Sequence, residues 1–312
     1  MFLSPMDPSA LVLFSEATLS LYPILIRTLP TTLFTQWFAR FLTFPVLAYL
    51  LASSRDIPSL SSLFALLLRP STFFAGLLNL VHIGASYVSF SLLPAGVALS
   101  LFYTYPLFNV LAGSIVFGEA LSVFTFTLLA IALFGVWLLS REQAPPAPLA
   151  TPAPPPTLLP TPLLSSLSPS TMGIIAALVA ALTETLLYVF VRWTAVKEAS
   201  TPFTAILQLY PIGLLVLLAF IGINPSILDL RPHILLPLFG FNALIGFIGY
   251  ATRFYTIPKV STLVFSLLSF VGVLFGYLWG HWFTSDRITP MSLLGSGLIV
   301  VSAFLARYQN QK

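Results

Sequence analysis

The longest charge-free stretch of the chain runs from residue 70 to residue 118, with 49 positions that hold no Asp, Glu, Lys or Arg. A helix needs about 20 apolar residues to cross the hydrocarbon core of a bilayer, and the backbone must satisfy its own hydrogen bonds there. Further charge-free stretches cover residues 120–140, 199–228, 232–252, 260–285 and 288–306. The pattern predicts an all-α membrane protein that crosses the bilayer many times.

Composition supports this prediction and excludes other classes. Only 7% of the residues are charged, against about 25% in soluble domains. The absence of Cys excludes disulfides and thiol chemistry, and His82, His233 and His281 lack the spacing of metal ligands. We therefore expect no enzyme, no metal and no cofactor. No basic patch favours nucleic acid, which leaves the lipid bilayer and a small molecule as expected partners.

Ten apolar segments are long enough to span the membrane. We predict transmembrane helices over residues 8–27, 31–51, 71–92, 95–118, 122–140, 171–193, 201–222, 232–254, 260–283 and 290–308. Between the fifth and sixth segments, ten prolines occur within the 26 residues 144–169, a composition typical of an extended tether. The predicted organisation is a five-helix unit at 1–142, a Pro-rich linker at 143–170 and a second five-helix unit at 171–312.

The two units share motifs in the same order. The third segment reads NLVHIGASYVSFSLLP and ends at Pro94, and the eighth reads NALIGFIGYATRFYTIP and ends at Pro258. Glu16 and Glu184 occupy equivalent places in the first helix of each unit. Because each unit has an odd number of spans, the second copy enters the membrane upside down. The sequence therefore predicts an inverted repeat, as in secondary transporters.

Loop cations predict the orientation, because Lys and Arg accumulate on the cytoplasmic side. With the N-terminus inside, eight cations fall on that side and four on the other. The eight are Arg55, Arg69, Arg192, Lys197, Arg253, Lys259, Arg307 and Lys312, and the four are Arg27, Arg141, Arg231 and Arg287. We expect both termini in the cytosol.

Two segments resemble a known family. LLPAGVALSLFYTYPLFNVLAGSIVFGEALS, at 92–122, is similar to the fourth helix of EamA-type members of the drug/metabolite transporter superfamily, with its Gly-Glu-x-x-Ser exit. WFARFLTFPVLAYLL, at 37–51, resembles the second helix, which often carries an arginine. The second half departs from the pattern with Gly280-His281 in place of Gly-Glu. The resemblance implies ten helices, a central cavity and solute movement by alternating access.

Glu16 and Glu184 are the principal candidates for a functional site. An ionisable group at the bilayer midplane costs about 2.5–3.5 kcal/mol on insertion scales, so it faces a wet cavity or a partner. One interpretation is a pair that handles protons or cations and meets the substrate. The other is structural, for example an ion pair between Glu16 and Arg40, which also lies near the middle of its span.

Other polar residues within the spans are candidates for the cavity lining. Together with Glu16 and Glu184, the predicted substrate-binding set is Asn79, His82, Tyr103, Asn109, Tyr188, Asn242 and Arg253. The alternative for each is an interhelical hydrogen bond, worth about 0.6 kcal/mol. Tyr22 and Tyr308 suit interfacial anchoring, and Glu119 is interpreted as marking a turn. Gly272, Gly276 and Gly280 predict a close helix contact, and Pro45, Pro106 and Pro211 predict kinks.

These observations favour a secondary or facilitative transporter of a small polar or amphipathic metabolite, with protons as a candidate coupling ion. One alternative is an antiporter of nucleotide sugars or phosphorylated anions, which Arg253 and Lys259 would grip. Another is a membrane scaffold or receptor that moves no solute. The sequence is compatible with a monomer or a homodimer.

Overall fold

The computed structural model describes residues 6–52, 60–93, 95–141, 168–284 and 289–309. Of the residues that the structure describes, 85% are helical and none lies in a strand, which confirms the predicted all-α class. The Pro-rich linker predicted at 143–170 falls outside the described residues, except for residues 168–170 at the start of α9.

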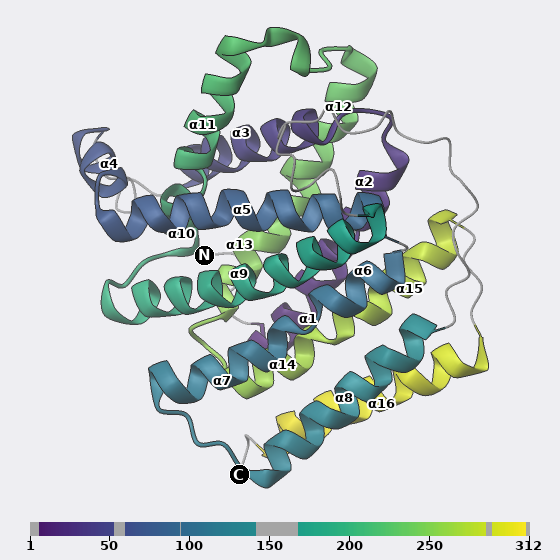
Figure 1. Ribbon diagram of the computed structural model, residues 1–312. Coiled ribbons are helices and arrows are strands. Elements are labelled where there is room, and N and C mark those ends of the chain that lie inside the picture. Colours follow the sequence, from purple (N-terminus) through teal and green to yellow (C-terminus); the bar gives the residue numbers. More distant parts are fainter. Residues whose placement is uncertain (1–5, 53–59, 94, 142–167, 285–288, 310–312) are drawn as a thin grey trace.

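The helices follow one another closely along the chain (Figure 1). Their bounds are α1 Pro8–Leu19, α2 Tyr22–Thr28, α3 Leu33–Leu51, α4 Leu60–Leu67, α5 Pro70–Leu92, α6 Ala95–Phe102, α7 Tyr105–Phe117, α8 Val123–Arg141, α9 Pro169–Lys197, α10 Pro202–Leu209, α11 Pro211–Ile223, η1 Pro225–Ile227, α12 Pro232–Phe241, η2 Asn242–Gly246, α13 Phe247–Thr256, α14 Thr262–Ser269, α15 Val271–Thr284 and α16 Pro290–Gln309.

Helical residues occupy each of the ten predicted ranges, and α4 is an additional helix that we did not predict. Seven helical stretches among the described residues are long and apolar enough to cross a membrane. They are Pro8–Thr28, Pro70–Leu92, Ala98–Phe117, Pro169–Lys197, Pro202–Ile223, Pro232–Thr256 and Thr262–Phe283. The count of ten spans and the inverted repeat remain predictions.

Proline and small hydroxyl residues set many of the helix starts. Pro169 opens α9 and Pro202 opens α10, where proline's fixed φ suits the first turn and its missing N–H leaves no donor unsatisfied. Ser168 and Thr201 precede these prolines, and each side chain accepts a hydrogen bond from the backbone N–H three residues on. These caps satisfy donors that the first helical turn leaves free.

Several predicted spans are discontinuous near their middle. α6 ends at Phe102 and α7 resumes at Tyr105, just before Pro106, while α10 and α11 meet at Tyr210 before Pro211. Both prolines therefore interrupt their helices, as the sequence suggested. Pro45, in contrast, lies inside an uninterrupted α3. Breaks also separate α1 from α2 and α14 from α15, and η2 is a π-helical turn within the eighth segment.

Two helix pairs organise the bundle. α5 and α9 lie side by side and antiparallel (Figure 1). Two contacts show the direction: Arg69 at the start of α5 pairs with Glu198 at the end of α9, and Gly173 near the start of α9 faces Leu93 at the end of α5. α8 and α16 form a second pair, at the lower right of Figure 1, in which a Cβ at Gly135 would lie 2.7 Å from a backbone oxygen of α16.

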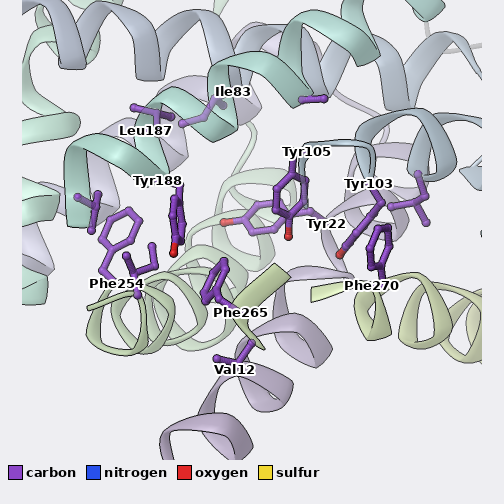
Figure 2. Packing of buried hydrophobic residues seen from close by; sticks show 14 of the residues in the cluster. Val12, Tyr22, Ile83, Tyr103, Tyr105, Leu187, Tyr188, Phe254, Phe265 and Phe270 are labelled. Atoms are coloured by element: carbon purple, nitrogen blue, oxygen red, sulfur yellow. The ribbon is translucent and has the colours of Figure 1, made fainter. Parts of the chain in front are cut away.

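The core between these pairs is rich in aromatic side chains. Tyr188 of α9 packs on Phe265 of α14 with ring centroids 5.0 Å apart, and Tyr103 and Tyr105 lie 5.5 Å apart at the α6–α7 break (Figure 2). Most of these tyrosines come from the discontinuous segments, so hydroxyl groups reach the middle of the bundle. Most of the interior is consequently apolar, and polar atoms lie where the helices are interrupted.

Candidate functional site

Arg253 of α13 lies at the centre of the molecule and holds both glutamates. Its Nη1 donates a hydrogen bond to Glu16 Oε1 of α1, and its Nη2 donates to Glu184 Oε1 of α9 at 2.6 Å. The three residues are 4%, 1% and 6% exposed, respectively. Two carboxylates from the two halves of the chain thus share one guanidinium, whose planar fork suits bidentate pairing.

His82 and Tyr103 extend this cluster. Nε2 of His82 lies 3.1 Å from Glu184 Oε2, and the hydroxyl of Tyr103 donates to Glu16 Oε2 at 3.0 Å. Nδ1 of His82 faces the backbone oxygen of Ala180 at 3.1 Å. Nδ1 also lies 3.3 Å from the Thr183 hydroxyl. If Nδ1 carries the hydrogen and donates it to the carbonyl, the contact with Glu184 requires a second proton, either on Nε2 or on the carboxyl oxygen.

The eighth segment reaches the cluster along one face. Asn242 Oδ1 accepts a hydrogen bond from the Tyr22 hydroxyl at 2.9 Å, and a Cβ at Gly249 would lie 2.9 Å from Leu19. Arg253 then meets Glu16 one to two turns further along. Small residues such as Gly249 allow the backbone of η2–α13 to pack closely against that of α1–α2. The two segments run antiparallel, and this packing places Arg253 next to Glu16.

Discontinuous backbone surrounds the same carboxylates. Gly272 opens the first turn of α15, where a Cβ would lie 2.7 Å from Glu16 Oε2 and would overlap the Tyr103 hydroxyl. Gly276 approaches Leu99 of α6 in the same way. These two positions confirm the predicted close contact of the glycine ladder. Irregular backbone at membrane depth is tolerated where it is buried in protein or lines a cavity.

A cavity of about 50 Å³ adjoins the cluster, enough for about three waters. Its wall contains Glu16, Leu19, Ser20, Tyr22, Pro23, Arg40, His82, Ser86, Tyr87, Phe90, Leu99, Phe102, Tyr103, Tyr105, Glu184, Tyr250 and Arg253. On α5 this wall extends from His82 to Phe90, towards the end of α5 that meets the start of α9. The cavity therefore lies on one side of the charged cluster.

A second polar cluster lies on the other side. Gly118 ends α7 in the left-handed conformation (φ 68°), and the turn brings Glu119 to Arg192 Nη2 at 2.5 Å. Glu119 also accepts from the backbone N–H of Thr262, the first residue of α14, at 3.1 Å, and Arg192 donates to the Thr262 hydroxyl. Arg192 lies eight residues beyond Glu184 on α9, about 12 Å along the helix. The cluster ties α7, α9 and α14 together.

Five of the predicted substrate-binding residues line the cavity, and four do not. The five are Glu16, His82, Tyr103, Glu184 and Arg253. The others lie in the surrounding packing: Asn79 donates to the Leu209 carbonyl, Asn242 contacts Tyr22 and the Leu238 carbonyl, Tyr188 donates to Thr262, and Asn109 is fully buried outside the cavity wall. Asn79, Asn242 and Tyr188 therefore make contacts between helices, whereas the buried amide of Asn109 has no hydrogen-bond partner among the described residues.

Several interpretations from the sequence are corrected. Glu16 pairs with Arg253 and not with Arg40. Arg253 does lie in the last turn of its helix, but it is buried and paired with two carboxylates, so it is no loop cation. Tyr22 is 4% exposed and lines the cavity, so it is no interfacial anchor. Lys259 is exposed over the Tyr255 ring and does not join Arg253 in one site.

Sequence reasoning did not select several of the lining residues. Tyr87, Tyr105 and Tyr250 face the cavity but are not in the predicted substrate-binding set, although Tyr105 shares a face of its span with Asn109, which is. Arg40 was treated only as an ion-pair partner, yet it lines the wall. The proximity of Tyr105 to the break before Pro106 was the signal that could have identified it, because irregular helix segments expose side chains to a cavity.

The fold and the buried charged cluster define a multi-pass helical membrane protein. Residues 171–308 match the family model of the EamA-like transporter family, which is part of the drug/metabolite transporter superfamily. This match confirms the expected resemblance to the superfamily, and it lies in the second half of the chain, outside the segments 92–122 and 37–51.

Solved structures share the fold. Twenty-five chains match. One of them is the crystal structure of a protein that is 16% identical to this chain, with a TM-score of 0.66 and with 98% of both chains covered. At this identity the likeness concerns the fold alone. No curated protein matches the sequence.

Proposed function

We propose that the protein is a secondary transporter that moves a small polar or amphipathic metabolite through the cavity beside Arg253 by alternating access. The observation that carries this proposal is the placement of Glu16 and Glu184 from the two halves of the chain, both buried, both against one arginine and both on the cavity wall. Charged groups buried at membrane depth mark substrate or ion pathways.

The arrangement of the two polar clusters supports alternating access. The cavity extends from Glu184 towards the start of α9, whereas Glu119 and Arg192 link three helices towards its end. In this conformation the substrate path is closed at the Glu119 end. A rocking motion of the five-helix units would break that link and close the cavity side, as expected for ten spans in an inverted repeat.

Protons are the proposed coupling ion. The ring of His82 lies between two acceptors, the Ala180 carbonyl and the Glu184 carboxylate, so one proton is placed between His82 and Glu184. This proton borders the cavity and is available for exchange when the site changes access. The predicted orientation, with both termini in the cytosol, would place the Glu119 cluster on the cytosolic side.

A flux screen in proteoliposomes tests the proposal. Amino acids, nucleobases and nucleotide sugars are offered with and without a pH gradient, and at least one class is expected to show saturable flux. Glu16→Gln and Glu184→Gln should abolish that flux or its response to the gradient. Glu198→Gln is the matched control, because Glu198 pairs with Arg69 at the exposed end of α9.

Two results would contradict the proposal. Wild-type flux in both glutamine variants from pH 5 to pH 8 would remove the two carboxylates from the mechanism. No saturable flux for any solute, in protein that is folded and correctly inserted, would favour the alternative of a scaffold or receptor.

A further inference from the structure

Arg40 of α3 is a buried cation without a carboxylate. Its side chain is 2% exposed, and among the described residues it makes no salt bridge. Nη2 donates to the Tyr210 hydroxyl at 3.3 Å, while Nε has no hydrogen-bond partner. A buried charge is costly unless it is paired, so this residue has unused capacity for an anion.

Aromatic rings surround the guanidinium. Its central carbon lies 4.6 Å from the Tyr22 ring centroid and 4.5 Å from that of Tyr250, with Phe44 and Tyr87 also within 6 Å. Cation–π contacts stabilise the charge in the absence of a counterion, and they hold the side chain in one orientation. The ring faces also provide an apolar surface next to the charged group.

The two arginines of the cavity wall differ in what they already bind. Arg253 is occupied by Glu16 and Glu184, whereas Arg40 lines the same cavity and its buried Nε–H has no hydrogen-bond partner. A planar guanidinium with free N–H groups suits a carboxylate or phosphate bound side-on. Among the cavity-lining cations, Arg40 is therefore the one placed to receive an anion.

We propose that Arg40 binds the anionic group of the solute, a carboxylate or a phosphate, while the Tyr22, Tyr87 and Tyr250 rings hold an apolar part. The substrate class is thus an amphipathic organic anion or zwitterion. This inference rests on the proposed transport function and adds the substrate class to it. It also differs from the anion grip predicted at Arg253 and Lys259, because the cation involved is on α3.

The first test uses the wild-type protein and needs no variant. Thermal unfolding of the purified protein in detergent is followed at constant ionic strength with increasing benzoate, benzamide, phenyl phosphate or phenol. A ligand that binds the folded state raises the unfolding temperature. Benzoate or phenyl phosphate is expected to stabilise the protein more than its neutral counterpart, and the stronger of the two identifies the headgroup. Equal shifts within both pairs would overturn the proposal.

The second test assigns the anion to Arg40. Arg40→Gln should lower the apparent affinity for the stabilising anion about tenfold or more, because a charge-assisted hydrogen bond is lost. Arg40→Lys keeps the charge but not the planar guanidinium, so its anion affinity should lie between those of wild type and Arg40→Gln. This variant replaces Arg40→Gln in the test if the glutamine variant does not fold. Arg69→Gln, at an exposed arginine, is the control. Unchanged anion affinity in both Arg40 variants would overturn the assignment.

Flux measurements separate this inference from the proposed function. If Arg40→Gln transports an uncharged solute and the matched anion at wild-type rates, Arg40 has no role in substrate choice. The proposed transport function is then retained, and only the inference about Arg40 fails. If the wild-type protein moves no solute at all, the transport proposal fails independently of how benzoate binds.

Discussion

Nε2 of His82 lies 3.1 Å from Glu184 Oε2, while Nδ1 of the same ring faces the Ala180 carbonyl and the Thr183 hydroxyl. His82→Gln keeps a polar side chain but cannot carry the exchangeable proton. We expect flux of the variant to lose its response to a pH gradient while some downhill flux remains. His233→Gln, at an exposed position of α12, is the control. An unaltered gradient response in His82→Gln would exclude this residue from coupling.

Removing Arg253 should destabilise the protein strongly. Arg253→Gln leaves Glu16 and Glu184 buried without their cation, and breaking a buried ion pair from one side typically costs about 3–5 kcal/mol. A lower thermal unfolding midpoint in detergent should reveal the loss. The triple variant with Glu16→Gln and Glu184→Gln should recover part of it, since no unpaired carboxylate remains. Failure of the triple variant to recover would show that Arg253 contributes packing and not charge.

Gly272→Ala should impair both stability and transport. The new Cβ would lie 2.7 Å from Glu16 Oε2, and overpacking of a tight contact typically costs about 1–3 kcal/mol. Gly222→Ala on α11 is the matched control, because nothing lies within 4 Å of a Cβ there. Unfolding midpoints and flux of the two variants, compared at equal expression, check the prediction. Equal behaviour of the two alanine variants would contradict the close contact.

Breaking the Glu119–Arg192 link should open the closed end of the path. The chain has no Cys, so a single Cys introduced at Ser266 can be labelled without background. Ser266 is fully buried on α14, four residues after Thr262. With Glu119→Gln added, labelling by a membrane-impermeant maleimide should accelerate about tenfold or more, because a charge-assisted contact is lost. An unchanged labelling rate would mean that this cluster does not gate access.

Asp229 makes a pH-dependent ion pair and hydrogen bond outside the membrane-spanning segments. Its carboxylate pairs with Arg231 at 2.6 Å and accepts from Thr31, and the hydrogen bond from Arg231 lowers the pKa of Asp229 from its usual 3.8. With the folded-state pKa depressed, the stabilisation is present above pH 3.8 and is lost as pH falls through the lower, folded-state value.

The unfolding midpoint of wild type minus that of Asp229→Asn is therefore expected to be constant from pH 7 to pH 5. It should shrink only below about pH 4. High salt should reduce the difference, because the pair is near the surface. A difference that already changes between pH 7 and pH 5 would contradict the depressed pKa.

Much of the fold was predictable because hydropathy and helix signals are local. Long apolar segments located helices in ten ranges, and Pro106 and Pro211 marked two of the interruptions. Glu16 and Glu184 were identifiable as candidates because a carboxylate within an apolar helix requires a partner. The sequence alone therefore determined the all-α class, the approximate positions of most helices and two of the buried charges.

Only the tertiary structure decided how these charges pair. Arg253 is 237 residues from Glu16 along the chain, and its position near the predicted end of a span suggested a loop cation. Close packing through Gly249 brings it instead between two carboxylates, while Arg40, the expected partner, lies among tyrosine rings. Helix periodicity is a short-range property, whereas ion pairing depends on which helices pack and at what register, and that depends on all of the contacts together.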